Sequence, residues 1–229
     1  SGITELNSVT VNTSADIADF SGSFPATAFT LNGVGAARSV TMTQDGIATG
    51  KTMTISSGDT LVSTAVLLDG KTITGTGGKI TINSLEGDTT AVLGGIDVSG
   101  AIVNAGSTTG FSGTFPNAPF NLSGGYVVTM TSAGVTAALD INSGSGLTST
   151  ATLLDGTTIS GDGSLIINSL EGDTTAVLAG ITVSGTTTVN AGSNTTFAGT
   201  FPATAFTLGG DKEVTITNSS AITDDKTIT

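Results

Sequence analysis

The chain repeats itself. Residues Leu85–Leu93 and Leu170–Leu178 carry the same sequence, LEGDTTAVL, and shorter blocks recur at nearly the same spacing. The chain therefore contains about two and two-thirds copies of a unit of about 86 residues. We assign residues 1–95 to copy one, 96–180 to copy two and 181–229 to a truncated copy three. Because a repeat array buries its core by stacking copies, we expect a long surface rather than a single cleft.

The residue content favours β structure. Thr, Val and Ile suit pleated strands, and the 33 glycines suit turns. No segment keeps an apolar stripe at helical spacing over three turns. Each copy divides again into about four blocks of about 20–22 residues, within the range of one solenoid coil. We therefore predict an all-β chain folded as a parallel β-solenoid with about four coils in each copy.

A string of immunoglobulin-like β-sandwiches, one in each copy, is the alternative fold. That fold predicts a bulky core residue and a linker between copies. The chain has no Trp, and no Pro-rich or charged linker lies at the copy boundaries. Small turns about every ten residues and a slim aliphatic core favour the solenoid instead.

Copy one is longer than copy two between two repeated blocks. The extra residues lie between Phe29 and Leu67, whose counterparts in copy two are Phe120 and Leu153. Insertions between constant blocks usually map to surface loops, so we expect a longer loop there in copy one.

A Phe-x-Gly-[Ser/Thr]-Phe-Pro block occurs three times and holds most of the aromatic residues. Phe side chains at alternate positions would share one face of a strand, and Pro would end that strand. Phe lacks the polar edge that a carbohydrate platform uses, so we predict core packing for these rings. The three blocks are Phe20–Pro25, Phe111–Pro116 and Phe197–Pro202.

The charge balance is strongly acidic, with a net charge of −12. No basic residue lies between Lys79 and Lys212, although that stretch holds nine acidic residues. Nucleic acid is an unsuitable partner because phosphate binding depends on Lys and Arg. The acids must be solvated, screened by salt or neutralised by a bound metal.

The repeated Glu-Gly-Asp sequence is the candidate calcium site. Two hard carboxylates separated by one glycine can converge on Ca²⁺, and the Asp of each Leu-Leu-Asp-Gly block could add a ligand. Against this, a full site needs about six to eight oxygens, and the chain contains no EF-hand loop. Turn-forming acids are the alternative interpretation. The candidate ligands are Glu86, Asp88, Glu171, Asp173, Asp69 and Asp155.

Thr-x-Thr pairs raise a second surface function. Stacked in register on successive coils, such pairs could order water as an ice-binding face. The position in copy two that matches Thr72 and Thr74 reads Thr158-Ile159-Ser160, which interrupts that pattern. The other pairs are Thr41/Thr43, Thr52/Thr54, Thr215/Thr217 and Thr227/Thr229.

Catalysis has few suitable side chains. Without His or Cys the chain cannot form a Ser/His or Cys/His dyad, a thiol nucleophile or a disulfide. Paired carboxylates could hydrolyse glycosides, but Arg38 is the sole arginine and copy two has no basic residue. We expect no enzyme activity.

No apolar run reaches the ~20 residues needed to cross a bilayer, so we expect no transmembrane segment.

The whole chain resembles the repeat regions of large bacterial surface proteins, namely S-layer proteins, secreted adhesins and filamentous matrix proteins. The likeness rests on the acidic, Thr-, Ser-, Gly- and Ala-rich composition, the absence of Cys, and motifs such as Thr72–Ile82, TITGTGGKITI. The resemblance implies export as part of a longer polypeptide and an extracellular, cell-surface location. It also implies a scaffold that self-associates or, alternatively, an adhesin that binds glycan or a surface multivalently.

Overall fold

The computed structural model describes residues 9–132, 134–218 and 221–222. The chain divides into two compact units. Unit 1 comprises the residues up to Asn104 together with Gly113–Phe120, and unit 2 comprises Ala105–Ser112 and the residues from Asn121 onward. These units do not follow the copy boundaries.

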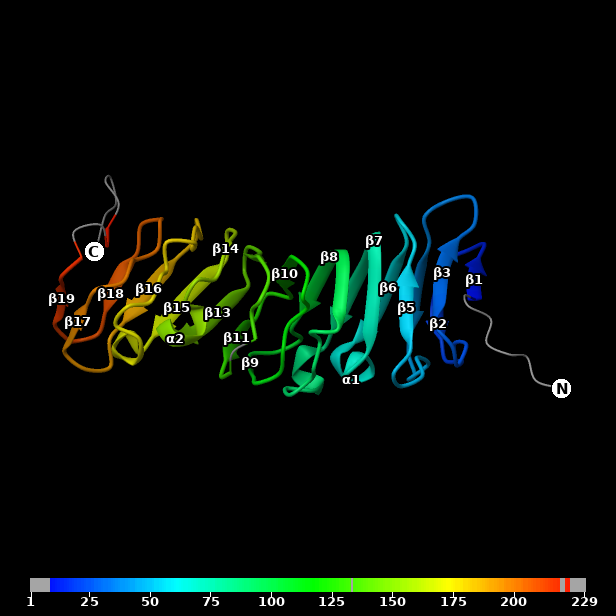
Figure 1. Cartoon of the computed structure of the whole chain (residues 1–229), viewed down its shortest axis with the longest axis horizontal. Coiled ribbons are helices and arrows are strands. Elements are labelled where there is room, and N and C mark those ends of the chain that lie inside the picture. Colours follow the sequence, from blue (N-terminus) through cyan, green and yellow to red (C-terminus); the bar gives the residue numbers. More distant parts are fainter. Residues whose placement is uncertain (1–8, 133, 219–220, 223–229) are drawn as a thin grey trace. The chain divides into compact units, whose positions relative to one another are not determined.

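Unit 1 contains two parallel sheets that share the two longest strands (Figure 1). The first sheet has the order β1-β3-β5-β7-β8, and the second runs β2-β4-β6 and continues into β7 and β8. The strands are β1 (Val9–Thr13), β2 (Ile17–Phe20), β3 (Phe29–Gly33), β4 (Ser39–Met42), β5 (Thr52–Ile55), β6 (Thr60–Thr64), β7 (Thr72–Asn83) and β8 (Ile96–Asn104).

Unit 2 repeats this arrangement with shorter strands. A six-stranded parallel sheet has the order β18-β16-β15-β13-β11-β9. A second set of parallel strands has the order β10-β12-β14, and β17 pairs with β19. The strands are β9 (Thr109–Phe111), β10 (Phe120–Ser123), β11 (Val127–Met130), β12 (Leu139–Ile141), β13 (Gly146–Thr150), β14 (Ile159–Ser160), β15 (Ser164–Asn168), β16 (Thr187–Asn190), β17 (Thr195–Phe197), β18 (Thr207–Gly209) and β19 (Val214–Ile216).

Helix is confined to single turns. The helix α1 (Ala65–Leu68) follows β6 and α2 (Ala151–Leu154) follows β13, at the same place in copies one and two. The 3₁₀ turns η1 (Leu85–Gly87) and η2 (Leu170–Gly172) follow β7 and β15. Within the described residues, no helix is long and apolar enough to cross a membrane.

The ladders confirm the predicted parallel β-solenoid. Every strand pair described in either unit is parallel, and each joins residues about twenty positions apart, such as Phe29 with Met53 and Leu139 with Ile159. Parallel strands at that separation are successive coils of one winding, whereas immunoglobulin-like sandwiches are built from antiparallel hairpins and Greek keys. The sandwich alternative is therefore wrong.

Inward-facing side chains stack in columns along each unit. In unit 1, Phe29 is paired with Met53, Met53 with Ile73 and Ile73 with Ile96, and all four are at least 98% buried. The alternating burial along each strand follows from the two-residue period of a pleated strand. Each copy therefore contributes apolar rungs to a core that runs along the coils.

The phenylalanine blocks lie in this core, as predicted. In unit 1, the rings of Phe24 and Phe29 stack at a centroid distance of 4.8 Å, and in unit 2 those of Phe201 and Phe206 lie 4.9 Å apart. Part of the local expectation was wrong, because the block does not continue one strand. Phe20 ends β2, so Phe24 reaches the core from the turn that follows that strand.

Three of the five extra residues of copy one lie in turns, as expected, and the other two lengthen β3 and β5 by one residue each compared with β10 and β12. The connection between β3 and β4 spans residues 34–38, whereas its counterpart between β10 and β11 spans only 124–126. The segment between β4 and β5, residues 43–51, is also longer than its counterpart, residues 131–138. The strands on either side keep the register of the array.

Candidate functional site

The six candidate ligands all lie at the turns where one coil passes to the next. Asp69 and Asp155 directly follow α1 and α2. Glu86 and Glu171 lie in the 3₁₀ turns η1 and η2, and Asp88 and Asp173 directly follow those turns. We call these two sets the acidic turns. Their hydrogen bonds show what the carboxylates do in the fold.

The Leu-Leu-Asp-Gly turn joins its coil to the next one at two points. The Oδ1 atom of Asp69 accepts from the backbone N–H of Val92 at 2.8 Å, while the N–H of Gly70 donates to the Val92 carbonyl at 3.0 Å. Copy two repeats this contact, with Asp155 accepting from Val177 at 2.7 Å. A carboxylate that accepts a backbone N–H in this way satisfies a donor that the strand ladder leaves unpaired.

The Glu-Gly-Asp turn also uses its carboxylates locally. The Oδ1 atom of Asp88 accepts from both the N–H and the hydroxyl of Thr90, at 3.0 and 2.9 Å. Asp173 makes the same two contacts with Thr175, each at 3.0 Å. An acceptor that reaches two residues along the chain fixes a tight turn.

The glutamates of these turns are engaged as well. Glu171 accepts from the N–H of Gly192 on the next coil at 2.7 Å, and Glu86, at the matching position of η1, also has an interaction partner. Five of the six candidate ligands thus have a carboxylate oxygen on a backbone N–H. Each acidic turn therefore has a structural use that requires no metal.

The acidic turns do not gather into a ready-made metal centre. Among the residues that the structure describes, no group of three or more acidic side chains is placed to hold an ion. Ca²⁺ prefers about six to eight oxygen ligands, more than one Glu-Gly-Asp turn offers. Calcium binding at these residues stays a prediction, and it would require ligands from more than one acidic turn or from a second chain.

A buried carboxylate outside the predicted set holds the connection between β3 and β4, which is longer in copy one than in copy two. Asp59, 2% exposed, accepts from the N–H of Gly33 at 2.6 Å and from the N–H of Arg38 at 2.8 Å. Ser145 is its counterpart before β13, and its hydroxyl accepts from the N–H of Gly125 at 3.1 Å. The longer turn of copy one is therefore matched by a two-oxygen acceptor, and the shorter one by a single hydroxyl.

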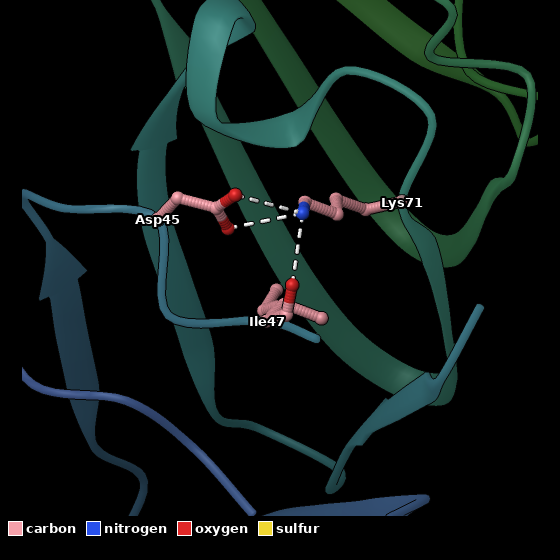
Figure 2. Close-up of polar contacts among 3 residues, drawn as sticks. All are labelled: Asp45, Ile47 and Lys71. Carbon is pink, nitrogen blue, oxygen red and sulfur yellow. Dashed lines mark hydrogen bonds and ion pairs between the residues drawn. The ribbon is translucent and has the colours of Figure 1, made fainter. Parts of the chain in front are cut away.

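Lys71 is a second residue that the sequence analysis did not single out. Its ammonium group lies 3.0 and 3.1 Å from the two carboxylate oxygens of Asp45 and donates to the Ile47 carbonyl at 2.8 Å (Figure 2). The Lys71 side chain is 9% exposed and that of Asp45 is 58% exposed. The pair fastens the segment between β4 and β5 to the turn that precedes β7.

The corresponding residue of copy two does not repeat this charge. Thr157 follows the second Leu-Leu-Asp-Gly block, and its hydroxyl donates to the Leu154 carbonyl at 2.7 Å, inside its own turn. The lysine contact therefore belongs to copy one alone. Lys71 therefore stabilises the longer β4–β5 segment of copy one and is not part of a binding group that recurs in each copy.

The Thr-x-Thr pairs stack over a limited distance. In unit 1, Thr52 is paired with Thr72 and Thr54 with Thr74, and the last two hydroxyl oxygens lie 3.3 Å apart. On the next coil, Asp97 stands opposite Thr74, so the row of pairs ends there. Thr227 and Thr229 lie outside the described residues. The Thr-x-Thr pairs that an ice-binding face would need therefore stack over only two coils on this sheet.

Asparagines form short ladders at the ends of the strands. The Asn104 amide donates to the Asn83 side-chain oxygen at 2.8 Å in unit 1, and the Asn190 amide donates to that of Asn168 at 2.9 Å in unit 2. These bonds join adjacent coils at matching places in successive copies.

No protein-family model, curated protein or solved structure matches this chain.

Proposed function

We propose that the chain is a non-catalytic structural repeat segment of a bacterial cell-surface or extracellular matrix protein, and that it forms a scaffold by self-assembly. The observation that carries the proposal is the use of the repeated residues. Asp69 and Asp155, like the asparagine pairs, recur from copy to copy because they join one coil to the next. Repetition of this kind lengthens a structure without creating a reactive site.

The extracellular location is part of the proposal and is supported by composition. The chain has no Cys, is rich in Thr, Ser and Gly, and carries a net charge of −12. These features are typical of repeat regions in exported surface proteins. The acidic charge also disfavours nucleic acid as a partner.

Self-assembly would bring acidic surfaces together, and divalent cations are the simplest way to neutralise them. The acidic turns of copy two, such as Glu171 and Asp173, lie in the long stretch that has no basic residue. Ca²⁺ shared between two chains could draw its oxygens from both, which would supply the ligands that one turn lacks. Calcium-assisted association is therefore the form of assembly that we propose.

Light scattering of the purified chain tests this proposal. The weight-average mass is measured in Ca²⁺ and then in EDTA at constant ionic strength, with Mg²⁺ as the control cation. We expect the mass to rise with Ca²⁺ and to fall on chelation. A chain that stays monomeric in all three solutions, at every concentration, would contradict both the assembly and the role of calcium.

A surface hollow in unit 1 supports a second candidate, a glycan-binding adhesin module. The hollow has a volume of about 270 Å³ and combines a carboxylate, that of Asp97, with the hydroxyl groups of Thr74, Thr76 and Ser99. Such groups can donate hydrogen bonds to sugar hydroxyls and accept hydrogen bonds from them. Saturable glycan binding by a monomeric chain that Asp97→Ala abolishes would favour this candidate over the scaffold.

A further inference from the structure

We propose that the outer face of the six-stranded sheet in unit 2 is the surface through which two copies of this chain associate, face to face. This inference rests on the proposed self-assembly and adds to it a contact that needs no calcium, beside the calcium bridges between acidic turns proposed above. We call this surface the uncharged face. Its strands are β9, β11, β13, β15, β16 and β18.

The first observation is the distribution of charge. In the part of the chain that the structure describes, no Asp, Glu, Lys or Arg occurs in any of these six strands. The carboxylates of unit 2 lie elsewhere, in the turns that carry Asp155, Asp162 and Glu171 and on the other sheet, where β12 holds Asp140. In a chain with a net charge of −12, this sheet is a place where two copies can meet without opposing carboxylates.

The second observation is a continuous column of β-branched side chains along this face. Thr129 is paired with Thr148, Thr148 with Ile166, Ile166 with Thr188, and Thr188 with Thr207. All five point outward, since the residues beside them in the strands, such as Leu147 and Ile167, are buried. Ile166, at the centre of the column, is 37% exposed. Such a column presents methyl groups at the regular spacing of the coils.

A second column, of Thr and Asn side chains, lies beside this column of Thr and Ile. It contains Thr150, which is paired with Asn168, and Asn190, whose amide donates to the Asn168 side-chain oxygen at 2.9 Å. Because that bond uses only part of each amide's capacity, the column can still donate and accept hydrogen bonds across an interface. The two columns together offer methyl groups, hydroxyls and amides without any charge, and the centres of protein contacts are likewise depleted of charged residues.

The size of the face sets the strength of the contact. Six strands at a spacing of ~4.8 Å, with about two outward residues in each, cover roughly 350 Å² per copy. A stable dimer buries about 800 Å² per partner, so one such contact is weak. Weak contacts become effective when they are repeated along an array.

Variants that place charges on the uncharged face test whether two copies associate through it. Sedimentation equilibrium over a concentration series, in EDTA and in Ca²⁺, compares the wild type with Thr148→Asp/Thr188→Asp and Thr148→Lys/Thr188→Lys. We expect weak dimerisation of the wild type, and at least about a tenfold loss in either variant alone because like charges would face each other. An equimolar mixture of the two variants should regain association, since each Asp face would then meet a Lys face.

Matched controls separate the face from charge in general and from folding. Thr10→Asp/Thr72→Asp adds the same charge to the first sheet of unit 1 and should dimerise like the wild type. Thermal unfolding identifies any variant that fails to fold, and the mixture of Asp and Lys variants provides a gain that misfolding cannot produce.

The outcomes distinguish this inference from the proposed function. If the wild type associates and the Thr148→Asp/Thr188→Asp variant associates equally well, the uncharged face is wrong while self-assembly stands. If the wild type is monomeric throughout, both are overturned. A monomeric wild type that retards ice growth, with loss of that effect in the Asp variant, would assign the face to ordered water and also overturn the inference.

Discussion

At the scale of single residues, acidic side chains in this chain act chiefly as hydrogen-bond acceptors between coils. Asp59 and Asp155 each accept a backbone N–H from a neighbouring coil, although one is buried and the other exposed. Ser145 and Glu171 do the same with a hydroxyl and a longer carboxylate. The acidic character of the chain thus arises in part from its turns, which need acceptors.

Replacing Asp59 should test this role most clearly. Because Asp59→Ala leaves the part-buried N–H groups of Gly33 and Arg38 without their charged acceptor, we expect a loss of about 2–3 kcal/mol in unfolding free energy. Ser145→Ala, at the matching place in copy two, should cost only about 1 kcal/mol because one neutral acceptor is lost. Urea unfolding measures both. Equal losses of unfolding free energy for the two substitutions would contradict the role of Asp59 as a charged acceptor of two backbone N–H groups.

A buried hydroxyl offers the opposite test. Thr187 is 2% exposed, and its Oγ1 atom has no hydrogen-bond partner, while Val9 occupies the matching position of copy one. Thr187→Val keeps the shape of the side chain and removes an unsatisfied polar atom, so we expect about 1 kcal/mol of added stability. Thr188→Val, one position along and facing outward, serves as the control and should change stability by less than about 0.5 kcal/mol. A destabilised Thr187→Val variant would show that its hydroxyl has a partner in solution.

At the scale of elements, the sequence predicted the strands better than the corners. The alternation of apolar and polar residues along Ser39–Met42 or Thr52–Ile55 identifies a strand directly, since burial follows the pleat. The helical turns α1 and α2 were not predicted, because four residues are too few to show a helical period. The acidic turns were located correctly, but carboxylate spacing along the chain cannot reveal which backbone N–H group each oxygen meets.

The residues that the sequence analysis missed depend on contacts between coils. Lys71 follows the first Leu-Leu-Asp-Gly block, and Thr157 takes its place after the second. The sequence around Lys71 does not reveal its partner, because Asp45 lies on the preceding coil. Asp59 resembles any other turn aspartate until the length of the facing turn is known. A comparison of copies could have marked both, because each coincides with the longer connections of copy one.

Substitutions of the glycines at the corners of the coils should destabilise the fold more than substitutions of glycines within strands. Gly161 has a φ of +110°, and a Cβ atom there would lie 2.3 Å from the Ile141 carbonyl oxygen of the preceding coil. Gly161→Ala should therefore cost about 2–4 kcal/mol, from backbone strain and from displacement of that coil. Gly110→Ala in β9, where the added atom meets nothing within 4 Å, is the matched control and should be nearly neutral. Thermal unfolding of both variants compares them, and a tolerant Gly161 would mean that the corner can relax.

At the scale of the whole molecule, the stability of each coil depends on its neighbours while the charge acts on all of them. The net charge of −12 opposes the compact state by self-repulsion, and copy two has no basic residue to offset it. Repulsion between exposed charges is screened over a Debye length of about 10 Å at 0.1 M salt. The ionic environment should therefore matter more to this chain than to one with balanced charge.

Salt and calcium should affect the chain in different ways. We expect the midpoint of thermal unfolding to rise by a few degrees between about 0.01 and 0.5 M NaCl, because screening weakens the self-repulsion. If Ca²⁺ acts only as a screening ion, CaCl₂ at matched ionic strength gives the same midpoint at every protein concentration. If it bridges chains through acidic turns such as Glu171 to Asp173, the midpoint rises further and the excess grows with protein concentration, because association stabilises the folded state by mass action. Calorimetry at two protein concentrations separates these cases. An excess independent of concentration would instead place the calcium ion within one chain and would favour Asp69, Asp155 and the Glu-Gly-Asp turns as its ligands.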